Sequence, residues 1–220
     1  MSRIVDVLSN LKRTLKCIYF DRSNRDLLGD GYIILRSLLT SHQIESLREA
    51  YSFARRDREM ASDGADQRSV FYDFDLINGM LLSHPLVSKT VSGYTPSHRN
   101  PAFVMRNLIV DTSLEGSGGG WHRDSYNPSL KIFIPLSRCT ERNGATVFML
   151  GSHTWRSKIR DFAYGPRIKY LGEPSERLSQ PELWPGDVVI ADTSCIHRGG
   201  RAAVPGRDML TVYFSHPGVL

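Results

Sequence analysis

Cysteine is scarce in this chain and forms no recognisable pairs. The 220 residues include three cysteines, Cys17, Cys139 and Cys195, and no CxxC motif. An odd, scattered set argues against a disulfide scaffold and against a cysteine-rich structural zinc site. The pattern indicates a reducing compartment, so we expect a cytoplasmic protein.

Long apolar runs, sequence repeats and low-complexity tracts are also missing. No run approaches the roughly 20 apolar residues that a membrane-spanning helix needs, and the N-terminus lacks the apolar core and cleavage site of a secretory signal. Hydrophobic residues make up 40% of the chain and charged residues 23%, as in ordinary globular proteins, which argues against disorder. A chain of this length favours one main domain.

Charge of one sign is in modest excess. The 28 Lys and Arg residues outnumber the 23 Asp and Glu residues, which gives a net charge of +5. The arginines are scattered, so a solvated basic surface and an anionic partner both fit this excess. At the N-terminus, Ile4–Tyr19 has the apolar spacing of an amphipathic helix, with basic residues between the apolar ones. Such a helix either packs on its own domain or makes peripheral contact with an anionic membrane surface, here the inner face of the membrane.

Helical patterns dominate the first hundred residues. We predict, in chain order, a strand at Gly31–Leu35, a helix capped by Thr40 or Ser41, a polar loop at Asp57–Arg68 and a helix at Leu76–Leu82 that ends before Pro85. The second half instead repeats apolar or alternating stretches of strand length, separated by Gly, Pro and Asn. These stretches are Phe103–Val110, Leu130–Leu136, Thr146–Leu150, Ile168–Leu171, Asp187–Ala191 and Met209–Phe214. The pattern predicts an α+β protein, mainly β, whose antiparallel sandwich or barrel has the helices packed outside.

Three residues have the spacing of metal ligands. His122 and Asp124 in WHRDSY point to one side of an extended segment, and His197 in CIHRGG can reach them from a neighbouring strand. Two histidines and one carboxylate leave open positions on an octahedral metal, as in non-haem Fe(II) oxygenases. The same set also suits a hydrolytic zinc site, and each residue alone fits a core or capping role. Arg207, just before a strand, can form a bidentate pair with a carboxylate of a diacid.

Several connected motifs resemble the phytanoyl-CoA dioxygenase family of Fe(II)- and 2-oxoglutarate-dependent oxygenases. The resemblance runs from about Gly29 to His216 and is carried by GYIILRSLLTSHQIESLREA, WHRD, ERNGATVFMLGSH, WPGDVVIADTSCIHRGG and Arg207 with its strand. It implies a double-stranded β-helix, a jelly-roll or cupin-like barrel with N-terminal buttressing helices. We therefore divide the chain into an N-terminal extension, 1–28, and one oxygenase domain, 29–220.

The resemblance also implies roles for individual residues. His122, Asp124 and His197 correspond to the iron ligands and catalytic centre, and Arg207 to the anchor for the distal carboxylate of 2-oxoglutarate. Fe(II) is the implied cofactor, with 2-oxoglutarate and O2 as cosubstrates. Further candidate residues are Asn107, Lys131, Phe133 and Thr211 for 2-oxoglutarate, and Trp121 and Tyr126 for the substrate pocket.

Four of these six secondary residues have a simpler alternative. Phe133, Trp121 and Tyr126 fit core packing equally well, and Lys131 fits an exposed strand end. The chain also departs from its relatives at Gly199, where many of them carry a hydroxyl residue that helps to hold 2-oxoglutarate. Thr211 or Tyr213 could supply the missing donor.

The implied reaction is hydroxylation of a C–H bond, with release of succinate and CO2. Halogenating relatives replace the carboxylate ligand with a small residue, so Asp124 favours hydroxylation. We expect a small-molecule substrate, either a small anionic metabolite or a glycolipid-type intermediate, and nothing specifies an obligate protein partner.

Two further functions compete with this interpretation. A catalytically silent jelly roll would bind a ligand without oxidising it, although the complete set of four residues argues against lost chemistry. A nucleic-acid demethylase shares HxD…H and a basic surface. However, the chain has no Lys/Arg cluster with interleaved aromatics to bind a strand, which argues against a nucleic-acid partner.

Overall fold

A computed structural model describes residues 25–60, 65–94, 100–113, 120–125, 128–162 and 177–214 of the protein. The predicted helix Ile4–Tyr19 and the predicted strand Ile168–Leu171 lie outside these residues. No helix within the described ranges is long and apolar enough to cross a membrane.

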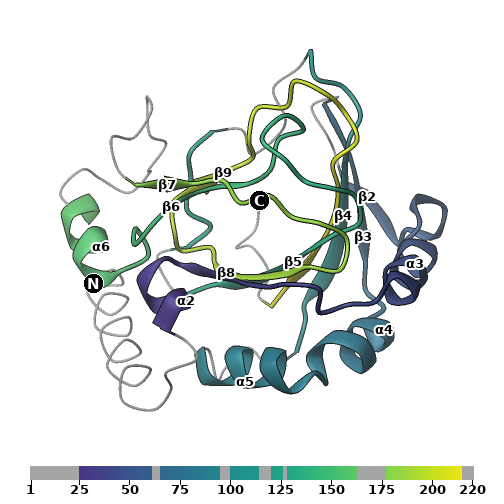
Figure 1. The fold of residues 1–220 in the computed structure, drawn as a ribbon, viewed down its shortest axis with the longest axis horizontal. Coiled ribbons are helices and arrows are strands. Elements are labelled where there is room, and N and C mark those ends of the chain that lie inside the picture. The colour runs from purple at the N-terminus through teal and green to yellow at the C-terminus, as the bar shows by residue number, and fades with distance from the viewer. Residues whose placement is uncertain are drawn as a thin grey trace.

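Two antiparallel sheets form the centre of the molecule. The larger has the order β1-β8-β5-β10-β4-β3-β2 and the smaller the order β7-β6-β9. Figure 1 shows the small sheet on one side of the large sheet and the helices on the other. The strands of the large sheet are β1 (Tyr32–Leu35), β8 (Val188–Asp192), β5 (Leu130–Pro135), β10 (Asp208–Tyr213), β4 (Phe103–Ile109), β3 (Asp66–Phe71) and β2 (Arg58–Met60), and those of the small sheet are β7 (Leu178–Ser179), β6 (Val147–Met149) and β9 (His197–Arg198). This arrangement confirms the predicted jelly roll.

Alternation along the strands separates two environments. In β5, Ile132 and Ile134 are fully buried on the helix side, whereas Lys131 and Phe133 point to the other face. On that face Phe133 packs with Phe148 of β6, so the inner surfaces of the two sheets meet there. The face toward the helices forms the main core. The face toward the small sheet carries a smaller apolar cluster that includes Phe148, together with residues of the candidate active site.

The helices cover the outer face of the large sheet (Figure 1). They are α2 (Arg25–Gly29), α3 (Ser41–Ala50), α4 (Asp75–Ile77) and α5 (Pro85–Tyr94), with α6 (Trp155–Phe162) beside the small sheet. Of the two predicted cap residues, Thr40 caps α3, through a reciprocal pair of hydrogen bonds with Gln43, and Ser41 is the first residue of the helix. Leu27 of α2 is fully buried in the core, so this short helix packs against the sheet.

The predicted loop at Asp57–Arg68 is wrong in part. Its two ends form strands, β2 and the start of β3, which pair as a hairpin at one edge of the large sheet. The segment is polar because Arg58 and Glu59 of the edge strand β2 are exposed, and because Asp66 and Arg68 of β3 form an ion pair. Polarity alone therefore could not distinguish this edge hairpin from a loop.

The predicted helix at Leu76–Leu82 is split, and the helices α2, α5 and α6 were not predicted. Residues 75–77 form α4, a π-helical turn follows at Asn78–Leu82, and Pro85 begins α5 rather than only ending a helix. Proline is tolerated at the first position of a helix because its missing N–H has no partner there. Helix α6 was missed because its sequence, WRSKIRDF, is short and mostly polar.

Candidate active site

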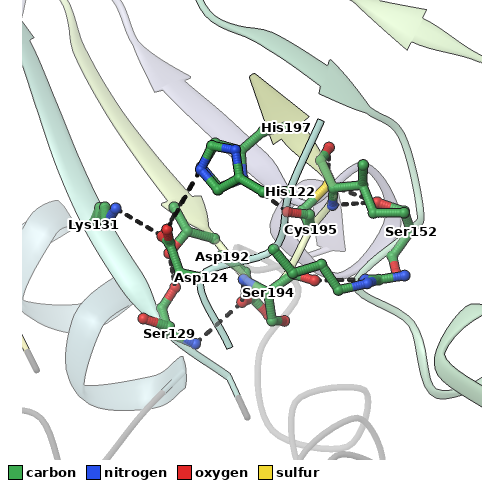
Figure 2. Close-up of polar contacts among 12 residues, drawn as sticks. His122, Asp124, Ser129, Lys131, Ser152, Asp192, Ser194, Cys195 and His197 are labelled. Carbon is green, nitrogen blue, oxygen red and sulfur yellow. Dashed lines mark hydrogen bonds and ion pairs between the residues drawn. The ribbon is translucent and has the colours of Figure 1, made fainter. Parts of the chain in front are cut away.

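The three predicted metal ligands come together at the small sheet. One possible ligand atom from each of His122, Asp124 and His197 lies within 4.8 Å of the others. The Asp124 carboxylate oxygens are 3.7 Å from His122 Nε2 and 3.9 Å from His197 Nε2. A β-bridge between His122 and His197 holds the two histidine segments side by side, and Figure 2 shows the side chains converging.

Backbone carbonyls orient both imidazole rings. His122 Nδ1 is 2.8 Å from the carbonyl of Gly120, and His197 Nδ1 is 2.9 Å from the carbonyl of Cys195. With Nδ1–H donating to a carbonyl, each Nε2 keeps its lone pair for a metal. Burial lowers the pKa of His197 to about 4. The ring is therefore neutral at physiological pH and need not release a proton before it binds a metal.

Lys131 lies against the acidic ligand. Its Nζ is 2.7 Å from Asp124 Oδ2 (Figure 2). The same Nζ is 4.3 Å from the ring centre of Tyr213. Burial would raise the pKa of Asp124, but Lys131 and His197 more than offset it and hold that pKa well below its ordinary value. Asp124 is therefore a carboxylate, the form that binds a cation.

Arg123 joins the two ligand segments from between His122 and Asp124. Its guanidinium donates to the carbonyls of Ser152 and Ser194, and the Ser194 bond is 2.6 Å long. Sequence reasoning missed this residue, although its place inside the HxD motif directs its side chain away from the metal and toward the neighbouring loops.

A buried turn after β8 leads to His197. Asp192 accepts hydrogen bonds from the Tyr94 hydroxyl at 2.6 Å and from the backbone N–H groups of Ser129 and Ser194. The Ser194 hydroxyl in turn accepts from the buried Lys158 ammonium at 2.8 Å. These bonds fix the turn that carries the distal histidine (Figure 2).

All four residues predicted for 2-oxoglutarate besides Arg207 share one face of the large sheet. Thr211 of β10 is directly opposite Phe133 of β5. On the other side of β10, Met209, two residues before Thr211, is directly opposite Asn107 of β4. Lys131 stands two residues before Phe133, at the end nearest the metal ligands. Because directly opposed residues in an antiparallel sheet point the same way, these side chains line the surface that faces the small sheet.

Arg207 ends this surface on the side away from Lys131. Its guanidinium donates to the carbonyl of Gly144 and, at 2.9 Å, to Asn107 Oδ1. Its Nε is buried and has no hydrogen-bond partner among the residues that the structure describes. Burial lowers the pKa of Arg207, so an anion beside it would relieve a buried cation. These features fit a carboxylate.

A charged pair that was not predicted stands behind Asn107. Asn107 Nδ2 donates to Asp66 Oδ2, and Arg68 binds the same oxygen at 2.8 Å. Both residues lie in β3, within the segment predicted as a loop, which is why the pair was missed.

The two aromatic residues predicted for the substrate pocket have different outcomes. Tyr126 lies outside the described residues. Trp121 is buried with Val147 and Ile196, and the Arg198 guanidinium lies 4.7 Å from its ring centre. Because neighbouring residues in extended backbone point to opposite faces, Trp121 is directed away from the His122 side.

Phe148 contributes an aromatic surface on the metal side instead. It lies opposite His197 in the small sheet, with ring centres 6.2 Å apart, and 6.4 Å from the ring centre of Phe133. The sequence placed Phe148 in a strand, but alternation alone could not say which face it occupied.

Comparison with known proteins gives one family and several related structures. The family described as phytanoyl-CoA dioxygenase (PhyH) matches residues 27–204. The epimerase SnoN in complex with Fe3+, alpha-ketoglutarate and nogalamycin RO is 15% identical, with a TM-score of 0.62 over 88% of this chain and 82% of SnoN. EctD from S. alaskensis with bound Fe is 15% identical, with a TM-score of 0.62 over 88% of this chain and 76% of EctD. HygX from Streptomyces hygroscopicus with nickel, 2-oxoglutarate and hygromycin B is 17% identical, with a TM-score of 0.57 over 85% of this chain and 83% of HygX.

Proposed function

The chain belongs to the phytanoyl-CoA dioxygenase family, and from this premise we propose that it hydroxylates a C–H bond of a small anionic molecule. It is an Fe(II)- and 2-oxoglutarate-dependent dioxygenase. The observation that carries the proposal is the convergence of His122, Asp124 and His197 at one end of a surface that Arg207 closes at the other.

The residues fit the two groups that the reaction requires. His122, Asp124 and His197 would hold the iron, because two neutral imidazoles and one carboxylate suit a divalent metal that keeps open positions. Arg207 would hold the distal carboxylate of 2-oxoglutarate through its guanidinium. When bound, the iron would let O2 oxidise the substrate and 2-oxoglutarate together: one oxygen atom of O2 would enter the C–H bond and the other the succinate, with release of CO2.

The protein's own contribution is orientation and exclusion of water. The Gly120 and Cys195 carbonyls fix the imidazole rings, and Lys131 holds the carboxylate of Asp124 in place. Phe133 and Phe148 give the surface beside them an apolar lining. A lining of this kind limits water near the reacting atoms and protects the oxidation from side reactions.

The proposed substrate is a small anionic metabolite or a glycolipid-type intermediate. The support is the chain's net charge of +5, together with the Lys131 ammonium beside the metal ligands. A screen for substrate-dependent succinate formation would test this, with neutral and anionic members of each compound pair. Equal rates for both members would contradict the charge preference, and an inverted centre in the product would indicate epimerisation rather than hydroxylation.

The primary experiment is an anaerobic titration of the purified protein with Fe(II) and then with 2-oxoglutarate. The chelate should give a weak visible charge-transfer band that saturates. The variants His197→Ala and Arg207→Ala should weaken it, whereas His42→Ala and Arg138→Ala, which change exposed side chains, should not.

Two results would contradict the proposal. Metal-loaded protein that shows neither the band nor affinity for 2-oxoglutarate would favour a silent ligand-binding protein. Preferential binding of zinc, with hydrolysis of an ester or amide substrate, would favour a hydrolase.

A further inference from the structure

We propose that Asp66 is a positioning residue that fixes Arg207, through Asn107, for the distal carboxylate of 2-oxoglutarate. The inference rests on the proposed function, since it concerns how the same site holds its cosubstrate. It adds a residue of β3, two strands away from Arg207 in the sheet order, to the machinery that selects a diacid.

Hydrogen bonds connect the four side chains in series. Arg68 Nη2 lies 2.8 Å from Asp66 Oδ2, and Asn107 Nδ2 donates to that same oxygen. On its other side, Asn107 Oδ1 accepts from Arg207 at 2.9 Å. Arg68 and Asn107 are directly opposite in the pairing of β3 with β4, so the sheet itself sets their separation.

Asp66 determines which way the Asn107 amide points. A carboxylate can only accept hydrogen bonds and a guanidinium can only donate them. The amide between them satisfies both when its NH2 faces Asp66 and its oxygen faces Arg207. Without the carboxylate only Arg207 favours this orientation, so the amide is held less firmly and Arg207 loses a fixed acceptor.

Burial makes this orientation costly to lose. Asp66 is 3% exposed, Asn107 6% and the Arg68 side chain 17%. The two guanidiniums and one carboxylate carry a net charge of +1, so one further negative charge completes the cluster. The buried Nε of Arg207 also has no partner among the described residues, which is consistent with a ligand carboxylate on that side.

Asn107 and Asp66 together restrict Arg207, so its single guanidinium is held in one orientation.

The test compares a diacid with a monoacid on the metal-loaded full chain. Zn(II)-loaded protein does not turn over, so calorimetry can measure the binding of 2-oxoglutarate and of pyruvate, which has the same oxoacid end but no distal carboxylate. We expect Asp66→Asn to weaken the affinity for 2-oxoglutarate by about 10-fold or more, because Asn107 loses its buried, charged hydrogen-bond partner. Pyruvate affinity should change by less than about twofold, since the metal ligands are untouched.

A double-mutant cycle separates positioning from general damage. Asn107→Leu should give the same selective loss, and Asp66→Asn combined with Asn107→Leu should lose no more than Asn107→Leu alone, because Asp66 acts through Asn107. Asp111→Asn, which removes an exposed carboxylate shortly after β4, is the matched control and should change neither affinity. If Asp66→Asn does not fold, Asn107→Leu and Arg68→Met provide the same comparison of diacid with monoacid.

The outcomes distinguish this inference from the proposed function. Additive losses, or equal losses for both oxoacids, would make Asp66 a purely structural residue and overturn the inference. An unchanged ratio of the two affinities would overturn it as well. If the wild-type protein binds neither oxoacid, the proposed function itself fails.

Discussion

Arg123 shows how much of a metal site depends on residues that never face the metal. It lies between two predicted ligands, yet its guanidinium binds carbonyls of residues 152 and 194, in the loops beside β6 and β9. These bonds hold the HxD segment against the turn that carries His197. Loss of the guanidinium should loosen the relative positions of all three ligands.

We therefore expect Arg123→Met to weaken metal binding by about 10–100-fold, the usual effect of removing a group that orients metal ligands. Anaerobic calorimetry with Fe(II) would measure this. Arg156→Met, which changes an exposed arginine of α6, is the matched control. Unchanged metal affinity in Arg123→Met would mean that the β-bridge between the two histidine segments suffices to hold the ligands.

The thiol of Cys139 provides a prediction about pH. Burial raises its pKa from 9.0 to about 12 in the folded protein. The pKa of the thiol is higher in the folded protein than in the unfolded protein, so the buried neutral thiol favours the folded state. This stabilisation is complete below pH 9 and is lost as the pH rises from 9 to 12. Relative to Cys139→Ala, the wild type should lose about 1 kcal/mol of unfolding free energy by pH 10.

Urea unfolding at pH 7.5, 9 and 10 would measure this difference. Cys195 is present in both proteins and cancels in the comparison. A stability difference that stays constant over this range would show that Cys139 is not buried as its surroundings indicate.

Single residues were predictable from the sequence where the chemistry needs a local spacing. His122 and Asp124 share one motif, and both fall into the cluster with His197 that the structure describes. Asp66 and Arg123 were not found, because their partners are 41 and 71 residues away and no local pattern marks the contact.

At the scale of elements, the turn before β6 connects backbone conformation with the site. Gly144 has a φ of +84°, and a Cβ there would lie 2.7 Å from the carbonyl oxygen of Gly200. Its own carbonyl accepts a hydrogen bond from Arg207. A side chain at this position should therefore disturb both the turn and the anchor.

Gly144→Ala should lower the unfolding free energy by about 2–4 kcal/mol, since backbone strain of about 1–3 kcal/mol adds to a steric clash. Gly206→Ala separates the two contributions, because Gly206 has a φ of +97° and open space around its missing side chain. Gly206→Ala should lower the unfolding free energy only by the backbone strain, about 1–3 kcal/mol. Thermal and urea unfolding would measure both variants, and equal losses would show that the contact with Gly200 does not matter.

Strands could be predicted from the sequence where burial of one face imposes an alternation of apolar residues. Strands such as β5 and β10 have one face in the apolar core, so their alternation was visible. The hairpin of β2 and β3 lies at an edge and contains charged residues, so hydrophobic pattern could not reveal it. Because this hairpin was predicted as a loop, Asp66 was not recognised as a candidate site residue.

At the scale of the whole molecule, the proposed cosubstrate would connect the two sheets. The proposed metal ligands His122 and His197 are joined by a bridge, and His197 lies in β9 of the small sheet, whereas Arg207 directly precedes β10 of the large sheet. A molecule bound at both ends would therefore hold these two parts of the fold together. Ligands that bind only the folded state stabilise it by mass action.

Metal and 2-oxoglutarate should thus raise the melting temperature in sequence. At a metal concentration 100 times its Kd, the gain is about 2.7 kcal/mol, or about 5–10 °C for a chain of this size. 2-Oxoglutarate should add a further shift only when metal is present, because its oxoacid end needs the metal and its other end needs Arg207. In Arg207→Ala the metal shift should remain while the second shift falls, and a chelator should reverse both in the wild type. A shift caused by 2-oxoglutarate without metal would instead mean that the diacid binds independently of His122, Asp124 and His197.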